Sequence, residues 1–140
     1  MPYPEMMLVP MREDLVRFGF QEMRTSDEVD QILSNSESGT VLVAVNSVCG
    51  CAAGMMRPGV AMSLENETKP DVLTTVFAGQ DLDATQRARE YITGYPPSSP
   101  SVALFKDGQL AYMMERHQIE GRTADQIAAD LRAAYDEVCG

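Results

Sequence analysis

Two short, uninterrupted apolar runs, residues 40–46 and 72–78, limit the possible folds of this chain more than any other feature. A strand with one face in water alternates apolar and polar side chains, whereas a strand covered on both faces is apolar throughout. Residues 40–46 therefore predict a central strand. The helical pattern of residues 52–64 lies between the two runs, and neighbouring parallel strands require such a crossover. We expect a strand–helix–strand unit whose helix bends at Pro58.

Further helices are predicted outside this unit. Met11, Leu15 and Phe18 recur at helical spacing, and Pro10 is expected in the first turn of their helix. The other helices are expected over residues 25–33, 83–92 and 123–138. The first and last of these begin with a threonine followed three residues later by Glu or Gln, which is the capping box of a helix N-terminus. The polar residues 34–39 predict a loop.

The C-terminal half adds an antiparallel hairpin, with strands over residues 101–105 and 109–114 around a Lys-Asp-Gly turn. The sheet is therefore expected to be mixed. A chain of 140 residues suffices for one domain with a sizeable core but not comfortably for two. We predict a single α/β domain over residues 1–140, in which residues 1–39 form a helical extension and residues 40–140 form a mixed sheet flanked by helices.

Charge and hydropathy exclude several classes of partner. The chain has 21 acidic and 11 basic side chains, and its formal net charge of -10 repels a phosphate backbone, so nucleic acid is not an expected partner. No run approaches the roughly 18 apolar residues of a membrane-spanning helix. The N-terminus also lacks the cationic and apolar segments of a signal peptide. We expect a cytoplasmic protein with no membrane partner.

The sequence Cys49-Gly50-Cys51 stands where the first predicted strand ends and the next helix begins. Unpaired N–H groups and the positive end of the helix dipole favour the thiolate over the thiol at such a position. Three cysteines cannot form a fully paired set of disulfides, and the cytoplasm keeps structural disulfides reduced. The pattern therefore favours redox chemistry at this dithiol.

This order of elements, with a dithiol at the first strand–helix junction and a proline before the hairpin, resembles the thioredoxin fold. Within that fold, residues 45–54, Val-Asn-Ser-Val-Cys-Gly-Cys-Ala-Ala-Gly, are similar to the signature of the bacilliredoxin family. Further segments similar to that family are Val9-Pro10-Met11-Arg12, Val76-Phe77-Ala78-Gly79-Gln80-Asp81, Pro97-Ser98-Ser99-Pro100-Ser101, and Arg116-His117 with Ile119-Glu120-Gly121. The resemblance extends over nearly the whole chain.

The resemblance implies a thiol–disulfide oxidoreductase that removes bacillithiol from S-bacillithiolated proteins of the cytoplasm. In the family's pattern Cys49 attacks and Cys51 resolves, bacillithiol is a co-substrate, and no bound cofactor is needed. Cys49 lies at the loop edge, where access is greatest, and we expect Cys51 to be more buried. Nothing in the dithiol itself selects bacillithiol, so the alternative is a general protein disulfide isomerase or reductase.

Candidate substrate-binding residues surround the dithiol in this interpretation. The thioredoxin-like fold places a cis-proline opposite the dithiol, and Ser99-Pro100 fits that position, the alternative being an ordinary trans-proline at a strand start. Gly50 and Asn46 are further candidates. Asn46 and Ser47 either hydrogen-bond the thiolate or simply end the strand. Bacillithiol is a carboxylate-bearing sugar conjugate, and Arg57 is a candidate cation for it.

Two other side chains have both a catalytic and an ordinary interpretation. Cys139 is a candidate second resolving thiol or relay, although residues so close to a chain end are usually exposed. His117 is either a cation that lowers the pKa of a nearby thiol or a solvated loop residue. Both residues, with Cys49 and Cys51, also make up a possible zinc set. One residue between the paired cysteines is fewer than the roughly two to four usual for zinc, so no metal is expected.

Overall fold

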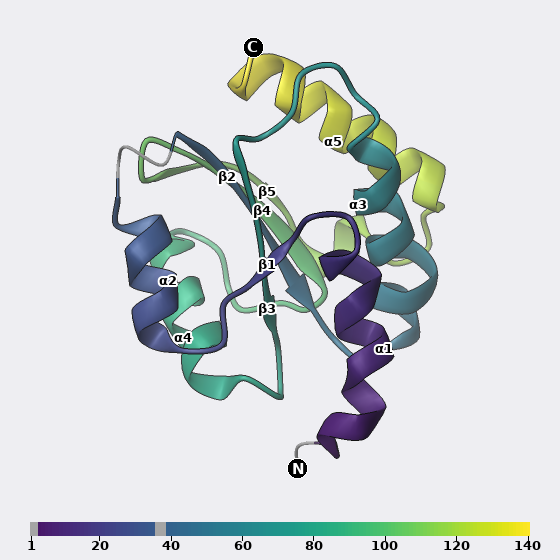
Figure 1. Ribbon diagram of the computed structural model, residues 1–140. Coiled ribbons are helices and arrows are strands. Elements are labelled where there is room, and N and C mark those ends of the chain that lie inside the picture. The colour runs from purple at the N-terminus through teal and green to yellow at the C-terminus, as the bar shows by residue number, and fades with distance from the viewer. Residues whose placement is uncertain (1–2, 36–38) are drawn as a thin grey trace.

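A five-stranded mixed sheet organises the computed structural model, which describes residues 3–35 and 39–140 (Figure 1). The strands are β1 (Gln21–Glu22), β2 (Thr40–Asn46), β3 (Val72–Phe77), β4 (Ser101–Lys106) and β5 (Gln109–Met114). Their order across the sheet is β1-β3-β2-β4-β5. Strand β3 runs parallel to β1 and β2, whereas β4 is antiparallel to β2 and β5. The predicted strand–helix–strand unit and the hairpin are both confirmed.

Helices cover both faces of this sheet. The helices on one face are α1 (Glu5–Val16), α3 (Arg57–Ser63) and α5 (Ala124–Val138), and those on the other are α2 (Ser26–Leu33) and α4 (Leu82–Tyr91) (Figure 1). All seven residues of β2 are buried. Leu42 packs into the core beneath α3 and α5, and its neighbour Val43 packs into the core beneath α2 and α4. Cover on both faces explains the uninterrupted apolar run of the central strand.

The predicted helix starts and the hairpin turn are present. Thr25 and Thr123 each accept a hydrogen bond from the backbone N–H three residues on, and both capping boxes are complete. The β4–β5 turn places Asp107 at φ 51° and Gly108 at φ 82°. Two consecutive residues with positive φ match the right-handed twist of a tight hairpin, which explains the Asp-Gly pair.

The N-terminal segment differs from the prediction. Helix α1 begins at Glu5, so Pro10 lies in the helix interior and not in its first turn. Proline has no N–H, so the carbonyl four residues before Pro10 receives no helical hydrogen bond. This turn faces solvent, and water can satisfy that carbonyl. Phe18 lies beyond the helix and is exposed, so it is not part of the buried face. The segment also contributes strand β1 and the buried side chain of Met23 to the fold, so it is more than a helical extension.

The helix after the dithiol is not one continuous α-helix. A π-helical turn (Ala52–Met56) precedes α3, and the N–H of Arg57 bonds to the carbonyl of Ala52 five residues back. Pro58 therefore falls in the first turn of α3, where a proline is better tolerated than in a helix interior. A π-turn thus lies on the N-terminal side of Pro58, and the bend expected at Pro58 itself stays a prediction.

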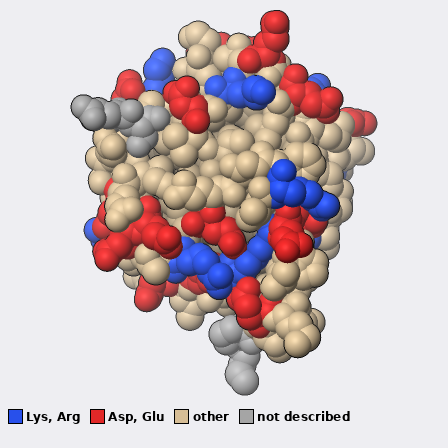
Figure 2. All heavy atoms as spheres, in the orientation of Figure 1, with Lys and Arg blue, Asp and Glu red and all other residues tan. Residues whose placement is uncertain are grey.

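Charged side chains of both signs are interspersed on the face shown in Figure 2, with an uncharged band across its middle. This face therefore carries no basic stripe of the kind that tracks a phosphate backbone. In the described part of the chain, no helix is long and apolar enough to cross a membrane. Of the polar loop predicted over residues 34–39, residues 36–38 lie outside the described residues.

Candidate active site

The dithiol lies just beyond the carboxyl end of the central strand β2. Cys49 stands in the bend before the helix, exposed Gly50 opens the first helical turn, and Cys51 follows within it. Both thiols are free and half-buried, so the expectation that Cys51 is more buried than Cys49 is not supported. The two cysteines differ instead in their hydrogen-bond partners and in the charges near them.

The surroundings of Cys49 favour the thiolate. Burial alone would raise the pKa of Cys49, but several donors outweigh it and the net pKa lies below that of an ordinary thiol. The Ser47 hydroxyl donates to Cys49 Sγ at 3.2 Å, and the backbone N–H groups of Cys51 and Ala52 point at the same sulfur. The charge of Arg116 adds a smaller contribution. Donors at a helix start lower a thiol pKa in this way.

The surroundings of Cys51 favour the protonated thiol. Its pKa is raised by burial, by the negative charge of Cys49 and by that of Glu120, and Arg116 only partly opposes these effects. The Cys51 thiol donates to Glu120 Oε1 at 3.8 Å, and Arg116 Nη2 lies 3.9 Å from the same sulfur. The two cysteines of one dithiol therefore have pKa values shifted in opposite directions.

Arg116 is the cation whose charge acts on both thiols, and the sequence interpretation missed it in favour of its neighbour His117. Arg116 pairs with Glu120 and donates from Nη1 to the Ser99 carbonyl at 3.0 Å. His117 is 73 % exposed in its side chain, and its charged partner is Glu115 at 3.9 Å. The available signal was the Arg-His pair after the last strand, but the sequence alone does not say which of the two faces the dithiol.

A groove brings the dithiol together with the proline turn. The Ser99-Pro100 peptide bond is cis, which decides between the two isomers that the sequence left open. The groove has a volume of about 380 Å³, and its lining includes Ser47, Cys49, Gln80, Arg89, Ser99 and Arg116. The structure thus places Ser99 beside Cys49, as the thioredoxin-like arrangement requires. Pro100 itself is buried behind the groove.

Asn46 and Arg57 lie beneath the site and not on its surface. Asn46 is 1 % exposed and Arg57 is 5 % exposed. The Asn46 side-chain oxygen accepts hydrogen bonds from Arg57 Nη1 and from the Ser47 N–H, both at 2.9 Å. Arg57 Nε also lies 3.1 Å from Asp14. Arg57 is therefore not available as the cation for a bound carboxylate, and Asn46 acts on the site by positioning Ser47, which itself bonds the thiolate.

Cys139 lies at the opposite end of the sheet from the dithiol. Burial raises its pKa, and its neighbours are Thr40, Asp71 and Lys106. Thr40 begins β2 and Asn46 ends it, so about 20 Å of strand separates this thiol from the dithiol at about 3.3 Å per residue. That separation contradicts a relay in this conformation. It also breaks up the zinc set, and no three His, Cys, Asp or Glu side chains in the described part of the chain are grouped for a metal.

Comparisons with known proteins agree with this geometry. Residues 3–139 match the model of a protein family described as disulphide isomerase. A bacilliredoxin of Koribacter versatilis is 59% identical over 99% of this chain and 94% of its own length, and one of Salinibacter ruber is 55% identical over 100% and 83%. Among solved structures, the oxidised thioredoxin of Plasmodium falciparum superimposes with a TM-score of 0.60 at 15% identity, covering 87% of this chain and 100% of that one.

Proposed function

The chain belongs to the bacilliredoxin family and is a thiol–disulfide oxidoreductase, and on that premise we propose that it removes bacillithiol from S-bacillithiolated proteins. Cys49 is the attacking thiol and Cys51 the resolving thiol. The observation that carries this assignment is the opposite shift of the two pKa values, with Cys49 facing the groove. Its partners are S-bacillithiolated proteins and bacillithiol in the cytoplasm, and the reaction needs no bound cofactor.

The first step is a thiol–disulfide exchange at the bacillithiol sulfur. The Cys49 thiolate attacks that sulfur, a new disulfide forms between Cys49 and bacillithiol, and the old disulfide breaks to leave the substrate protein's thiolate. No net oxidation occurs, because one disulfide replaces another. Hydrogen bonds from Ser47 and from two backbone N–H groups support this step, since they lower the pKa of Cys49 and so increase the fraction present as thiolate.

The second step frees Cys49. Either a bacillithiol thiolate attacks the adduct and leaves as bacillithiol disulfide, or Cys51 loses its proton and attacks Cys49 to release bacillithiol and close an internal disulfide. Protonated Cys51 beside Glu120 does not compete with Cys49 in the first step. The order of attack and resolution follows from this difference.

The proline turn provides a docking edge for the substrate. Ser99 lines the groove with Cys49, and its carbonyl is already held by Arg116, so the turn has a defined orientation toward the dithiol. Gly50 is exposed, and apart from its two chain neighbours no residue has an atom within 4 Å of the place where a Cβ would stand, so the surface between the two cysteines is open. In this proposal a bound disulfide lies between Gly50 and the Ser99-Pro100 turn.

Intact-mass analysis with a bacillithiolated substrate protein tests this function. We expect Cys51→Ala to gain one bacillithiol and Cys49→Ala to stay unmodified and inactive. If neither variant gains the adduct, but the wild type still reshuffles or reduces protein disulfides, the bacillithiol assignment fails. The general isomerase or reductase activity then becomes the better account, and the description of the matching family names the first of these.

A further inference from the structure

Arg89 of α4 differs from most arginines of this acidic chain in having no carboxylate partner. Within the described residues, the arginines that form ion pairs are Arg12, Arg17, Arg24, Arg57, Arg87, Arg116 and Arg122. The two that form none are Arg89 and Arg132. In a protein with a formal net charge of -10, an arginine without a carboxylate partner that lines the groove of a reactive thiol calls for a physical reason.

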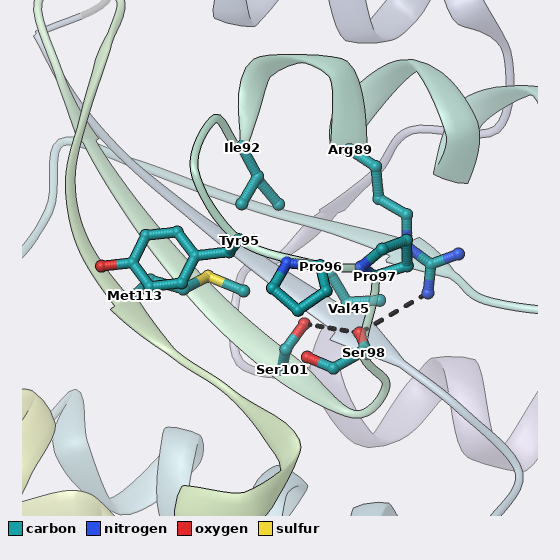
Figure 3. Close-up of a pocket in the computed structure, with 9 residues that line it drawn as sticks. All are labelled: Val45, Arg89, Ile92, Tyr95, Pro96, Pro97, Ser98, Ser101 and Met113. Carbon is teal, nitrogen blue, oxygen red and sulfur yellow. Dashed lines mark hydrogen bonds between the residues drawn. The ribbon is translucent and has the colours of Figure 1, made fainter.

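The guanidinium of Arg89 is half-buried and poorly satisfied. Its Nη2 reaches the Ser98 carbonyl at 3.5 Å, the limit of a hydrogen bond (Figure 3). Its Nε is buried and has no hydrogen-bond partner among the described residues. Burial lowers the pKa of Arg89, and no neighbouring charge compensates. A buried polar group without a partner costs free energy, and a charged one costs more.

Arg89 lines three cavities, and each of them also includes a residue of the segment 97–99. Figure 3 shows its guanidinium beside Pro97, at the edge of an apolar pocket of about 130 Å³ that also includes Tyr95. It also lines the groove of Cys49. Arg89 and the attacking thiol therefore line the same groove.

The groove is suited to a small anionic ligand. Its volume of about 380 Å³ falls in the range of small-molecule sites, which is roughly 300–1,000 Å³. Among the described residues that line it, two are arginines and none is acidic, and Gln80 and Ser99 add polar groups. Arg116 already pairs with Glu120, which leaves Arg89 as the cation without an anion.

We propose that Arg89 binds a carboxylate of the small thiol while that thiol is held on Cys49. This inference rests on the proposed function, because it assigns the subsite for the carboxylate-bearing part of bacillithiol. The disulfide between Cys49 and bacillithiol lies at one side of the groove. The carboxylate of bacillithiol pairs with the Arg89 guanidinium at another side. The ion pair satisfies the unpaired charge of Arg89 and selects acidic thiols over neutral ones. Arg89 is a specificity-determining residue in this account, and it takes no part in the exchange of sulfur atoms.

A single-turnover comparison of two mixed disulfides tests the subsite. One peptide is prepared with bacillithiol and, separately, with neutral 2-mercaptoethanol, and release of the peptide thiol is followed with the full-length Cys51→Ala protein and with its Arg89→Gln derivative. A charge-assisted hydrogen bond that is partly open to solvent corresponds to about a five- to tenfold change in rate. We expect Arg89→Gln to lower the bacillithiol rate by that factor and to leave the 2-mercaptoethanol rate within about twofold.

Two further variants control for charge and for folding. Arg132→Gln removes the other unpaired arginine, which donates to the Met62 carbonyl and does not line the groove, so it should leave the preference unchanged. Arg89→Lys keeps the positive charge and should recover part of the preference. An equal loss on both substrates in Arg89→Gln, or the same loss in Arg132→Gln, would overturn the subsite.

The outcomes separate this inference from the function on which it rests. If Cys51→Ala gains bacillithiol but Arg89→Gln keeps the full preference, only the subsite is lost. If Cys51→Ala gains no bacillithiol while the wild-type protein still reduces protein disulfides, the proposed function fails, and the subsite fails with it. A carboxylate supplied by the peptide rather than by the small thiol would lower both rates together, because both substrates share one peptide.

Discussion

The two ends of strand β2 carry thiols in contrasting environments. At the carboxyl end, Cys49 accepts hydrogen bonds from Ser47 and from backbone N–H groups, and its pKa is lowered despite burial. At the amino end, burial raises the pKa of Cys139, the charge of Asp71 adds to the rise, and the single hydrogen bond from Thr40 does not outweigh them. Burial is partial at both ends. The difference teaches that directed donors, and not exposure, create the attacking thiolate in this fold.

The largest expected effect comes from substituting the cysteines themselves. Cys49→Ser should lower bacillithiol removal by roughly three orders of magnitude, because a hydroxyl cannot form the mixed disulfide. Cys139→Ser should leave the rate and the recycling unchanged, since its thiol is about 20 Å of strand away. The steady-state rate at which the substrate protein's thiol is released measures the effect of both substitutions. A clear loss in Cys139→Ser would restore the relay that the structure argues against.

The next largest effect is expected from removing the Ser47 hydroxyl, the side-chain donor at the carboxyl end of β2. Ser47→Ala removes the hydroxyl that bonds the Cys49 sulfur, so the pKa of Cys49 should rise and the thiolate fraction near neutral pH should fall by about tenfold. Alkylation of Cys49 by iodoacetamide at pH 7 reports that fraction, and Cys139 in the same sample is the control. Unchanged alkylation of Cys49 would mean that backbone donors alone hold the thiolate.

A smaller change of opposite sign is expected at Cys51. Glu120→Gln removes a negative charge that helps raise the pKa of Cys51, so that pKa should fall. In a Cys49→Ala background, alkylation of Cys51 at pH 7 should rise about threefold, the size expected for a charge open to solvent. Slower alkylation of Cys51 would contradict the assigned role of Glu120.

The smallest effect is expected for Arg116, whose charge makes the smallest contribution to the pKa shift of Cys49. Arg116→Gln should raise the pKa of Cys49 slightly and lower its alkylation at pH 7 by about twofold. Because this contribution passes through solvent, it should disappear in about 1 M salt, where charges are screened within roughly 3 Å. A difference that persists at high salt would instead indicate that Arg116 acts by holding the Ser99 turn.

Local patterns allowed most of the fold to be predicted. The apolar run of β2, the capping threonines and the Asp-Gly turn each depend on residues that are close in sequence, so their structure could be read directly. Strand β1 has only two residues, too few to show the alternation of apolar and polar side chains by which a strand is recognised. Pro10 was misplaced because the apolar spacing around it does not show where a helix starts.

The candidate site was predictable only where it is local. Cys49 and Cys51 lie in one segment, and their position after a buried strand was sufficient to find them. Arg89 and Arg116 reach the groove from segments at least 38 residues away, through packing that no local pattern encodes. Arg57 was chosen for its nearness in sequence, yet the helix turns its side chain inward to Asn46.

The most direct test of the account is the pH dependence of iodoacetamide alkylation at each end of β2, measured by peptide mapping in the Cys51→Ser protein. Cys49 and Cys139 are then compared in the same molecule. The account predicts that the midpoint for Cys49 lies below the ordinary cysteine pKa of about 8.5 and that the midpoint for Cys139 lies above it. Equal midpoints, or a higher midpoint for Cys49, would contradict the claim that donors at the carboxyl end of the central strand create the attacking thiolate.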